Sequence, residues 1–153
     1  MPVTPTSIIK SRIAENIVEL LLEESNYKVT RIGTEGLLSG INRRDANKFN
    51  QSDAANQLKA SPSFVVIDKS GRGVALLKIR FRGARSRGGN IDYGVGQLQE
   101  YWPAAQLVVV SAIEPHFTVM TSTDKSAPIE EAFTQIKQKT LAQCRELIQK
   151  FLV

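Results

Sequence analysis

Apolar residues at helical spacing mark the two ends of the chain. Within residues 7–24 they recur every three or four positions, and glutamates follow one another four residues apart on a more polar side. This pattern predicts an amphipathic helix, with Asn26 as a candidate for its C-terminal cap. From residue 129 to the end of the chain a second helix is expected, from an apolar stripe made of Ile129, Phe133, Ile136, Cys144, Leu147 and Phe151.

Alternating or continuous apolar segments between these helices predict strands. Residues 27–32 alternate along the chain and are typical of one strand. Residues 64–68 and 73–82 are apolar arms joined by four turn-forming residues, which predicts a β-hairpin near the middle of a sheet. Two further short strands are expected, at residues 107–111 and 117–121.

Two polar segments and one more helix complete the chain. Residues 34–61 form a mostly polar insert, in which one modest helix is expected within 44–59. Residues 83–91 form a basic, glycine-rich loop. The next helix is expected to be capped by Asp92 and to end at Pro103.

The order of these elements predicts a fold class. It runs helix, strand, insert, hairpin, helix, two strands and helix, and the chain has 153 residues, of which 42% are hydrophobic. One domain over residues 1–153 is therefore expected, in the α/β class bordering on α+β. We expect a central mixed sheet of about five strands flanked by helices.

Composition narrows the possible chemistry. The single cysteine, Cys144, excludes an internal disulfide and is expected to be a small core residue, while the single histidine, His116, argues against a histidine zinc site or a serine triad. We expect His116 to face solvent in a loop. The longest apolar runs have four residues, and the first ten residues lack the pattern of a secretory signal. A cytoplasmic protein with no membrane partner is expected.

The positive charge of the chain is concentrated in one segment. The net charge is +5, yet residues 69–87 contain seven basic residues and no acidic one, and the rest of the chain carries thirteen basic and fifteen acidic residues. A concentrated cationic segment is typical of proteins that bind a polyanion, most commonly nucleic acid. The basic residues of the segment are Lys69, Arg72, Lys78, Arg80, Arg82, Arg85 and Arg87.

The hairpin geometry predicts which of these cations share a surface. With a four-residue loop, Asp68 pairs with Gly73, and the same register places Ser63 opposite Lys78. Alternation then puts Arg80 and Arg82 on the face that carries Lys78, with Leu77, Ile79 and Phe81 on the other face. Asp68 lies at the turn, and turn formation is its expected role.

The element order and the hairpin sequence, PSFVVID followed by LLKIRFR, resemble the restriction-endonuclease-like PD-(D/E)XK superfamily. The resemblance covers residues 7–121 and implies an αβββαβ core. In that family an aspartate at the start of the second strand and an acidic residue and a lysine on the third hold a catalytic metal ion. A glutamate of the first helix and a glutamine or lysine of the following helix often complete the site.

The resemblance implies equivalent positions here, three of which depart from the family pattern. Glu15 (or Glu19) takes the helix position, and Gln97 takes the position on the later helix. Ser63 stands where the family has aspartate, Lys78 where it has an acidic residue, and Arg80 where it has lysine. Lysine and arginine would repel Mg²⁺, which prefers oxygen ligands, and would attract phosphate. No metal or other cofactor is expected at this site.

Three functional hypotheses follow. The first is a catalytically inactive nuclease fold that binds the phosphate backbone of nucleic acid through five basic residues: Lys78, Arg80, Arg82, Arg85 and Arg87. Three aromatic residues follow this segment and serve either base stacking or ordinary helix packing: Tyr93, Tyr101 and Trp102. The second is an active Mg²⁺-dependent endonuclease whose carboxylates have moved, with Glu15, Glu19, Asp68 and Asp92 as the available acids.

The third hypothesis is a non-catalytic interaction subunit. In it Lys78 and Arg80 pair with Glu15 and Glu19 as an internal ion network that fixes geometry without adding much stability. A homodimer or another protein partner is compatible with this hypothesis. A salt series separates it from the first hypothesis, because only a nucleic-acid binder loses affinity for a polyanion as ionic strength rises.

Overall fold

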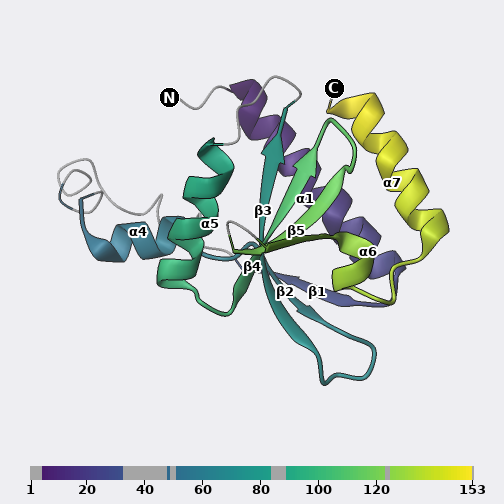
Figure 1. Cartoon of the computed structure of the whole chain (residues 1–153), viewed down its shortest axis with the longest axis horizontal. Coiled ribbons are helices and arrows are strands. Elements are labelled where there is room, and N and C mark those ends of the chain that lie inside the picture. The colour runs from purple at the N-terminus through teal and green to yellow at the C-terminus, as the bar shows by residue number, and fades with distance from the viewer. Residues whose placement is uncertain (1–4, 33–47, 49–50, 84–88, 123–124, 153) are drawn as a thin grey trace.

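The computed structural model describes residues 5–32, 48, 51–83, 89–122 and 125–152. Helices lie on both faces of one central sheet, so the molecule has three layers (Figure 1). The described helices are α1 (Pro5–Glu24), α4 (Asp53–Lys59), α5 (Gly89–Tyr101), α6 (Ile129–Ala132) and α7 (Gln138–Phe151). The described strands are β1 (Lys28–Arg31), β2 (Phe64–Ile67), β3 (Val74–Arg82), β4 (Ala105–Ser111), β5 (Phe117–Ser122) and β6 (Lys125–Pro128).

The sheet is mixed and follows the order of the chain. Its strands lie in the order β1-β2-β3-β4-β5-β6. Only β3 and β4 are parallel among these neighbours, and α5 makes the crossover that a parallel pair requires. The succession α1, β1, β2, β3, α5, β4 has the αβββαβ form, so the predicted α/β class is confirmed. Helix α4 falls within the predicted polar insert.

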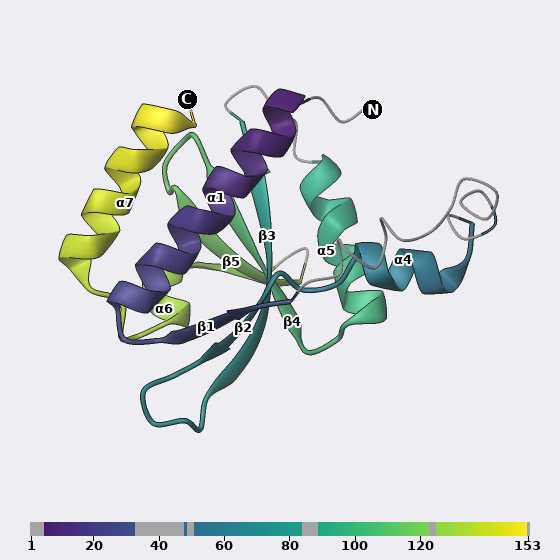
Figure 2. The same cartoon turned by 180° about the vertical axis from the view of Figure 1, so that it is seen from behind.

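One face of the sheet is covered by α1 and α7, which lie side by side (Figure 2). Helix α1 contributes a buried stripe, of which Ile17, Val18 and Leu21 are members, to the larger core cluster. The chain leaves α1 through Asn26, whose φ of +71° is the left-handed conformation that ends helices, as expected for a cap. The buried hydroxyl of Ser25 then accepts a hydrogen bond from the Lys137 amide at 3.0 Å, which ties the end of α1 to the start of α7.

The other face of the sheet is covered by α5, with α4 beside it (Figure 1). Val95 and Leu98 of α5 pack with Leu107 and neighbouring residues of β4 in a second, smaller cluster. Trp102 packs against this cluster, and its indole Nε1 donates a hydrogen bond to the carbonyl oxygen of Gln57 at 3.0 Å. Trp102 therefore has a packing role that joins α4 to α5.

The C-terminal third differs from the prediction of one long helix. The expected helix from residue 129 is two helices, α6 and α7, separated by residues 133–137. Phe133 and Ile136 lie in the bend between them and are buried there. Their apolar side chains therefore do not require a helix at these positions. The structure also adds β6, which makes a sixth strand. Its sequence, KSAP, has neither alternation nor β-branched residues, so the pattern did not predict that it would pair with the neighbouring strand β5.

Two further expectations about single residues were wrong. Helix α5 begins at Gly89, so Asp92 lies in its first turn and is not the N-cap. His116 does not face solvent: its side chain is 2% exposed, and Nδ1 lies 2.9 Å from the carbonyl oxygen of Ser111. The backbone folds His116 inward because its own carbonyl accepts from the Ser111 amide at 2.8 Å, which brings the residue into line with β5.

Cys144 is a buried core residue, as predicted. Its Sγ lies among apolar side chains of the larger cluster, 3.9 Å from the carbonyl oxygen of Ile17. Burial raises the pKa of the thiol to about 11, because the thiolate would lose its hydration. Among the residues that the structure describes, none of the helices has the length and apolar character needed to cross a lipid bilayer.

Candidate nucleic-acid interface

The β2–β3 hairpin has the predicted register. Phe64 pairs with Leu77 and Ile67 pairs with Val74. The Asp68 amide donates to the carbonyl oxygen of Gly73 at 3.0 Å, so the loop has the four residues that the sequence predicted. This register determines which β3 side chains share a face, and the candidate site is built on it.

Asp68 closes the hairpin turn. Its carboxylate accepts hydrogen bonds from the hydroxyl of Ser70 at 2.6 Å and from the amide of Gly73 at 3.1 Å. These two hydrogen bonds, with the Ser70 bond the stronger influence, lower the pKa of the Asp68 carboxyl below its ordinary value. Gly71 supplies the positive φ, +74°, that the turn requires. Turn formation is thus the role of Asp68, as predicted.

A pH-dependent effect follows at this turn. Because folding lowers the Asp68 pKa, the ionised carboxylate stabilises the native state at neutral pH, and this contribution is lost as the pH falls through the lowered pKa. We expect Asp68→Asn to unfold at lower urea than the parent at about pH 7, and the difference to shrink toward about pH 2. Glu100→Gln, the same change on exposed α5, is the control. A difference that stays constant with pH would contradict this role.

Strand β3 presents two chemically different faces, as predicted. Leu77, Ile79 and Phe81 belong to the cluster under α1 and α7, whereas Leu76 packs under α5. By alternation Lys78, Arg80 and Arg82 follow Leu76 on the α5 side. We call these three residues the cationic stripe. At about 3.3 Å per residue the stripe is about 13 Å long from Lys78 to Arg82.

The neighbours of the cationic stripe on β4 are mostly apolar. In the parallel register Lys78 is beside Leu107 and Arg80 is beside Val109. Apolar flanks lower the local dielectric, so a charge of opposite sign that approaches the stripe is attracted more strongly than it would be in bulk water.

Helix α5 lies against the middle of the stripe. A β-carbon at Gly94 would be 3.6 Å from Nε of Arg80, so the guanidinium lies close to the surface of α5 at this glycine. Gln97, the position that the family resemblance singles out, follows Gly94 by three residues and is half-buried on the same helix. The structure therefore brings α5 and Arg80 together.

Ser63 is engaged in the hydrogen bonding of the sheet. Its hydroxyl accepts from the Ile79 amide at 3.3 Å, and its own amide donates to the Leu77 carbonyl at 2.6 Å. Its carbonyl accepts from the Ile32 amide at 2.9 Å. Ser63 thus contacts the residues on both sides of Lys78 and joins three strands.

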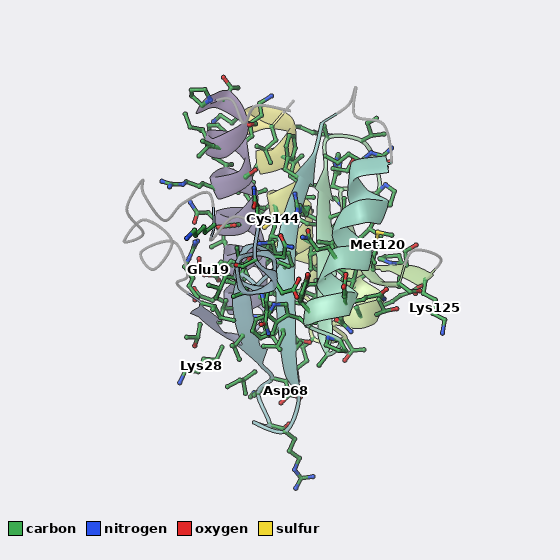
Figure 3. The ribbon with its side chains drawn as sticks, turned by 90° about the vertical axis from the view of Figure 1, so that its left-hand side faces the viewer. Glu19, Lys28, Asp68, Met120, Lys125 and Cys144 are labelled. Carbon is green, nitrogen blue, oxygen red and sulfur yellow. The ribbon has the colours of Figure 1, made fainter. Side chains whose placement is uncertain are left out.

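The two glutamates of α1 lie on the other layer of the molecule, in contact with β1. Glu15 is 3.4 Å and Glu19 is 2.6 Å from the guanidinium of Arg31 (Glu19 is labelled in Figure 3). Arg31 is two residues after core-facing Val29, on the same face of β1, and so points toward α1. The third hypothesis expected Lys78 and Arg80 as partners of these glutamates, and Arg31 was missed.

The remaining cations of the basic segment fall into separate places. Lys69 and Arg72 lie in the hairpin turn that follows Asp68 (labelled in Figure 3), at the opposite end of β3 from Arg82. Arg85 and Arg87 lie outside the described residues, as do the side chains of Asp92 and Tyr93. The cations that form one segment of the sequence therefore lie on at least two separate surfaces of the folded protein.

One cation that the sequence prediction overlooked shares the face of the stripe. Lys28 of β1 is exposed and alternates with core-facing Val29, which places it on the α5 side of the sheet (Figure 3). Its pairing partner on β2 is Ile67, the last residue of that strand, so Lys28 lies nearer the hairpin tip than Lys78 does. Alternation in residues 27–32 was visible in the sequence, but the face could be assigned only once β1 was known to pair with β2.

The described cavities lie elsewhere. One of about 260 Å³ is lined by Tyr27, Asp68 and Phe133 among others, and one of about 320 Å³ by Val119 and Lys125 among others. They share residues of β4 and α6, on the side of the sheet that faces α1 and α7. Within the described ranges there is no group of three or more His, Cys, Asp or Glu side chains placed to hold a metal ion.

The chemistry of the stripe is that of anion binding. Arginine can donate two parallel hydrogen bonds to one phosphate group, and lysine contributes a point charge with three donors. Successive cations on one face of a strand are about 6.6 Å apart, so they can contact successive groups of an extended polyanion. Comparisons of the chain with protein-family models, with curated proteins and with solved structures find no match.

Proposed function

We propose that this protein binds the phosphate backbone of nucleic acid through the cationic stripe and does not cleave it. The observation that carries the proposal is the alignment of Lys78, Arg80 and Arg82 on one face of β3, between apolar β4 neighbours and α5. Contacts of lysine and arginine with phosphate give affinity without reading base sequence. Binding is therefore broad in sequence and sensitive to salt.

Absence of cleavage is supported by the chemistry of the same positions. A phosphodiesterase of the metal-dependent type needs carboxylates that hold a divalent cation beside the phosphate. Lys78 and Arg80 would repel such an ion, and the Ser63 hydroxyl already accepts a backbone hydrogen bond. Asp68 is bound into the turn, about 16 Å along the strand from Ser63.

The test is fluorescence anisotropy with labelled single-stranded and duplex DNA and RNA, in a salt series with Mg²⁺ present. If three phosphates are contacted, a plot of the logarithm of the binding constant against the logarithm of the salt concentration should have a slope of about −2 to −3. We expect the labelled strands to remain intact when they are run on a gel afterwards.

Two outcomes would contradict the proposal. Absence of binding at low salt would remove nucleic acid as the partner. Shortened strands would show that carboxylates placed elsewhere support hydrolysis, and would favour the active Mg²⁺-dependent nuclease.

A further inference from the structure

Helices α1 and α7 form the outer layer on the side of the sheet away from the cationic stripe (Figure 2). They run in opposite directions, because the start of α7 is bonded to the end of α1 through Lys137 and Ser25. The start of α1 and the end of α7 consequently lie at the same end of the molecule (Figure 2). The connection between β4 and β5, which carries Ile113 with 55% of its surface exposed, lies at that end too.

The facing flanks of these two helices are apolar. On α1, Glu15 and Glu19 turn toward Arg31 of β1, and the opposite flank carries Ile9, Ile13 and Leu20. On α7, Arg145 turns toward Glu130 of α6 at 3.6 Å, and the opposite flank carries Leu147 and Phe151. We call these five apolar residues the seam: Ile9, Ile13, Leu20, Leu147 and Phe151.

Much of the seam is exposed to solvent. Ile9 is 58% exposed, Leu20 is 42% exposed and Phe151 is 51% exposed, while Ile13 and Leu147 are half-buried against the core. Large apolar side chains gathered on one helix pair are typical of an interaction surface, whereas single exposed ones are not. The exposed apolar area of the seam is therefore typical of a surface that another molecule covers.

The charges beside the seam are opposite on the two helices. The end of α1 carries Glu23 and Glu24, both exposed. The start of α7 carries Lys137 and Lys139, also exposed. Over their full lengths α1 has four acidic and two basic residues, and α7 has three basic residues and one acidic residue. Each helix therefore has the charge that the other would attract.

We propose that the seam is the dimer interface of this protein, and that its occupant is the seam of a second copy. A two-fold axis parallel to the helices places α1 of each copy on α7 of the other without reversing their ends. Ile9 then lies near Phe151 of the second copy, and Glu23 and Glu24 lie near the lysines at the start of its α7. One surface supplies both halves of the contact.

The size of the surface suits a weak dimer. A 20-residue helix is about 30 Å long, and two packed helices present a face about 20 Å wide. Each copy would cover about 600 Å², which is near the lower limit for specific association. The seam and the cationic stripe lie on opposite sides of the sheet, so the inference does not rest on the proposed function.

Charge reversal tests the arrangement without harming the helices. Glu23→Lys with Glu24→Lys adds positive charge at the C-terminal end of α1, and Lys137→Glu with Lys139→Glu adds negative charge at the N-terminal end of α7. Both changes are favourable with respect to the helix dipoles. The experiment is sedimentation velocity of the full chain without nucleic acid, over a range of protein concentrations.

We expect the parent to dimerise and each double variant alone to dimerise at least about tenfold more weakly, because like charges then face each other. A one-to-one mixture of the two variants should dimerise as the parent does, since both contacts are again between opposite charges. A loss of folding cannot produce this rescue. Glu100→Lys on α5, on the other side of the sheet, is a control for a charge reversal away from the seam and should leave the parent behaviour unchanged.

Three results would each overturn the inference: a parent that is monomeric at all concentrations, double variants that dimerise as well as the parent, or a mixture that associates no better than its components.

Discussion

Lys78→Glu combined with Arg80→Glu is expected to weaken nucleic-acid binding at low salt by at least about 100-fold. Each residue contributes a charge-assisted contact worth about 1.5–3 kcal/mol, and two such contacts correspond to that factor or more. The glutamates add repulsion of the phosphates to this loss. Anisotropy with the parent and the variant at one salt concentration measures the effect, and thermal unfolding shows whether the fold persists.

A matched variant separates the cationic stripe from net charge. Lys69→Glu with Arg72→Glu reverses two cations of the same segment at the hairpin tip, so the net charge changes equally. We expect this variant to bind within about tenfold of the parent when all three proteins are compared at about 0.1 M salt, because long-range attraction is then screened beyond about 10 Å. Equal losses in the two variants would show that binding responds to overall charge and not to the stripe.

Phe64→Ala is expected to lower the free energy of unfolding by about 3–5 kcal/mol. Phe64 is fully buried at the start of β2, in the cluster under α1 and α7. The guanidinium of Arg31 lies 5.3 Å from its ring centre, and that group is held by Glu15 and Glu19. Removing the ring leaves a cavity and takes away this contact between strand β1, strand β2 and helix α1.

Urea denaturation measures this effect as a lower midpoint with an unchanged slope, and the melting temperature should fall by about 10 °C. Ile8→Ala on the exposed side of α1 is the control, and its effect should be within about 0.5 kcal/mol. A similar midpoint for Phe64→Ala and the parent would mean that the ring is not part of the cooperative core.

The local pattern of apolar and polar residues was sufficient to predict most helices and strands of the fold. Helix α1, the β2–β3 hairpin and strands β1, β4 and β5 agree with their predicted positions to within a few residues. The register of the hairpin followed from one count of turn residues, and with it the two faces of β3. These features depend on contacts between residues close in the chain, which a sequence displays directly.

Other features depended on partners far away in the chain. The division of the C-terminal stripe into α6 and α7 follows from the burial of Phe133 and Ile136 in a bend, and a periodic pattern does not show such a bend. The inward position of His116 comes from its backbone pairing with Ser111 of β4. Lone polar residues in short connections have no periodicity, so their burial was decided by packing.

The amino-acid sequence by itself determined the α/β class, the cationic segment and the alternation that gathers Lys78, Arg80 and Arg82 on one face. Tertiary structure alone decided that Glu15 and Glu19 contact Arg31, that Lys69 and Arg72 lie apart from the stripe, and that α1 and α7 share a seam. The physical reason is the range of the interactions. Alternation acts between residues two apart, whereas ion pairs and helix packing join residues that only the folded chain brings together.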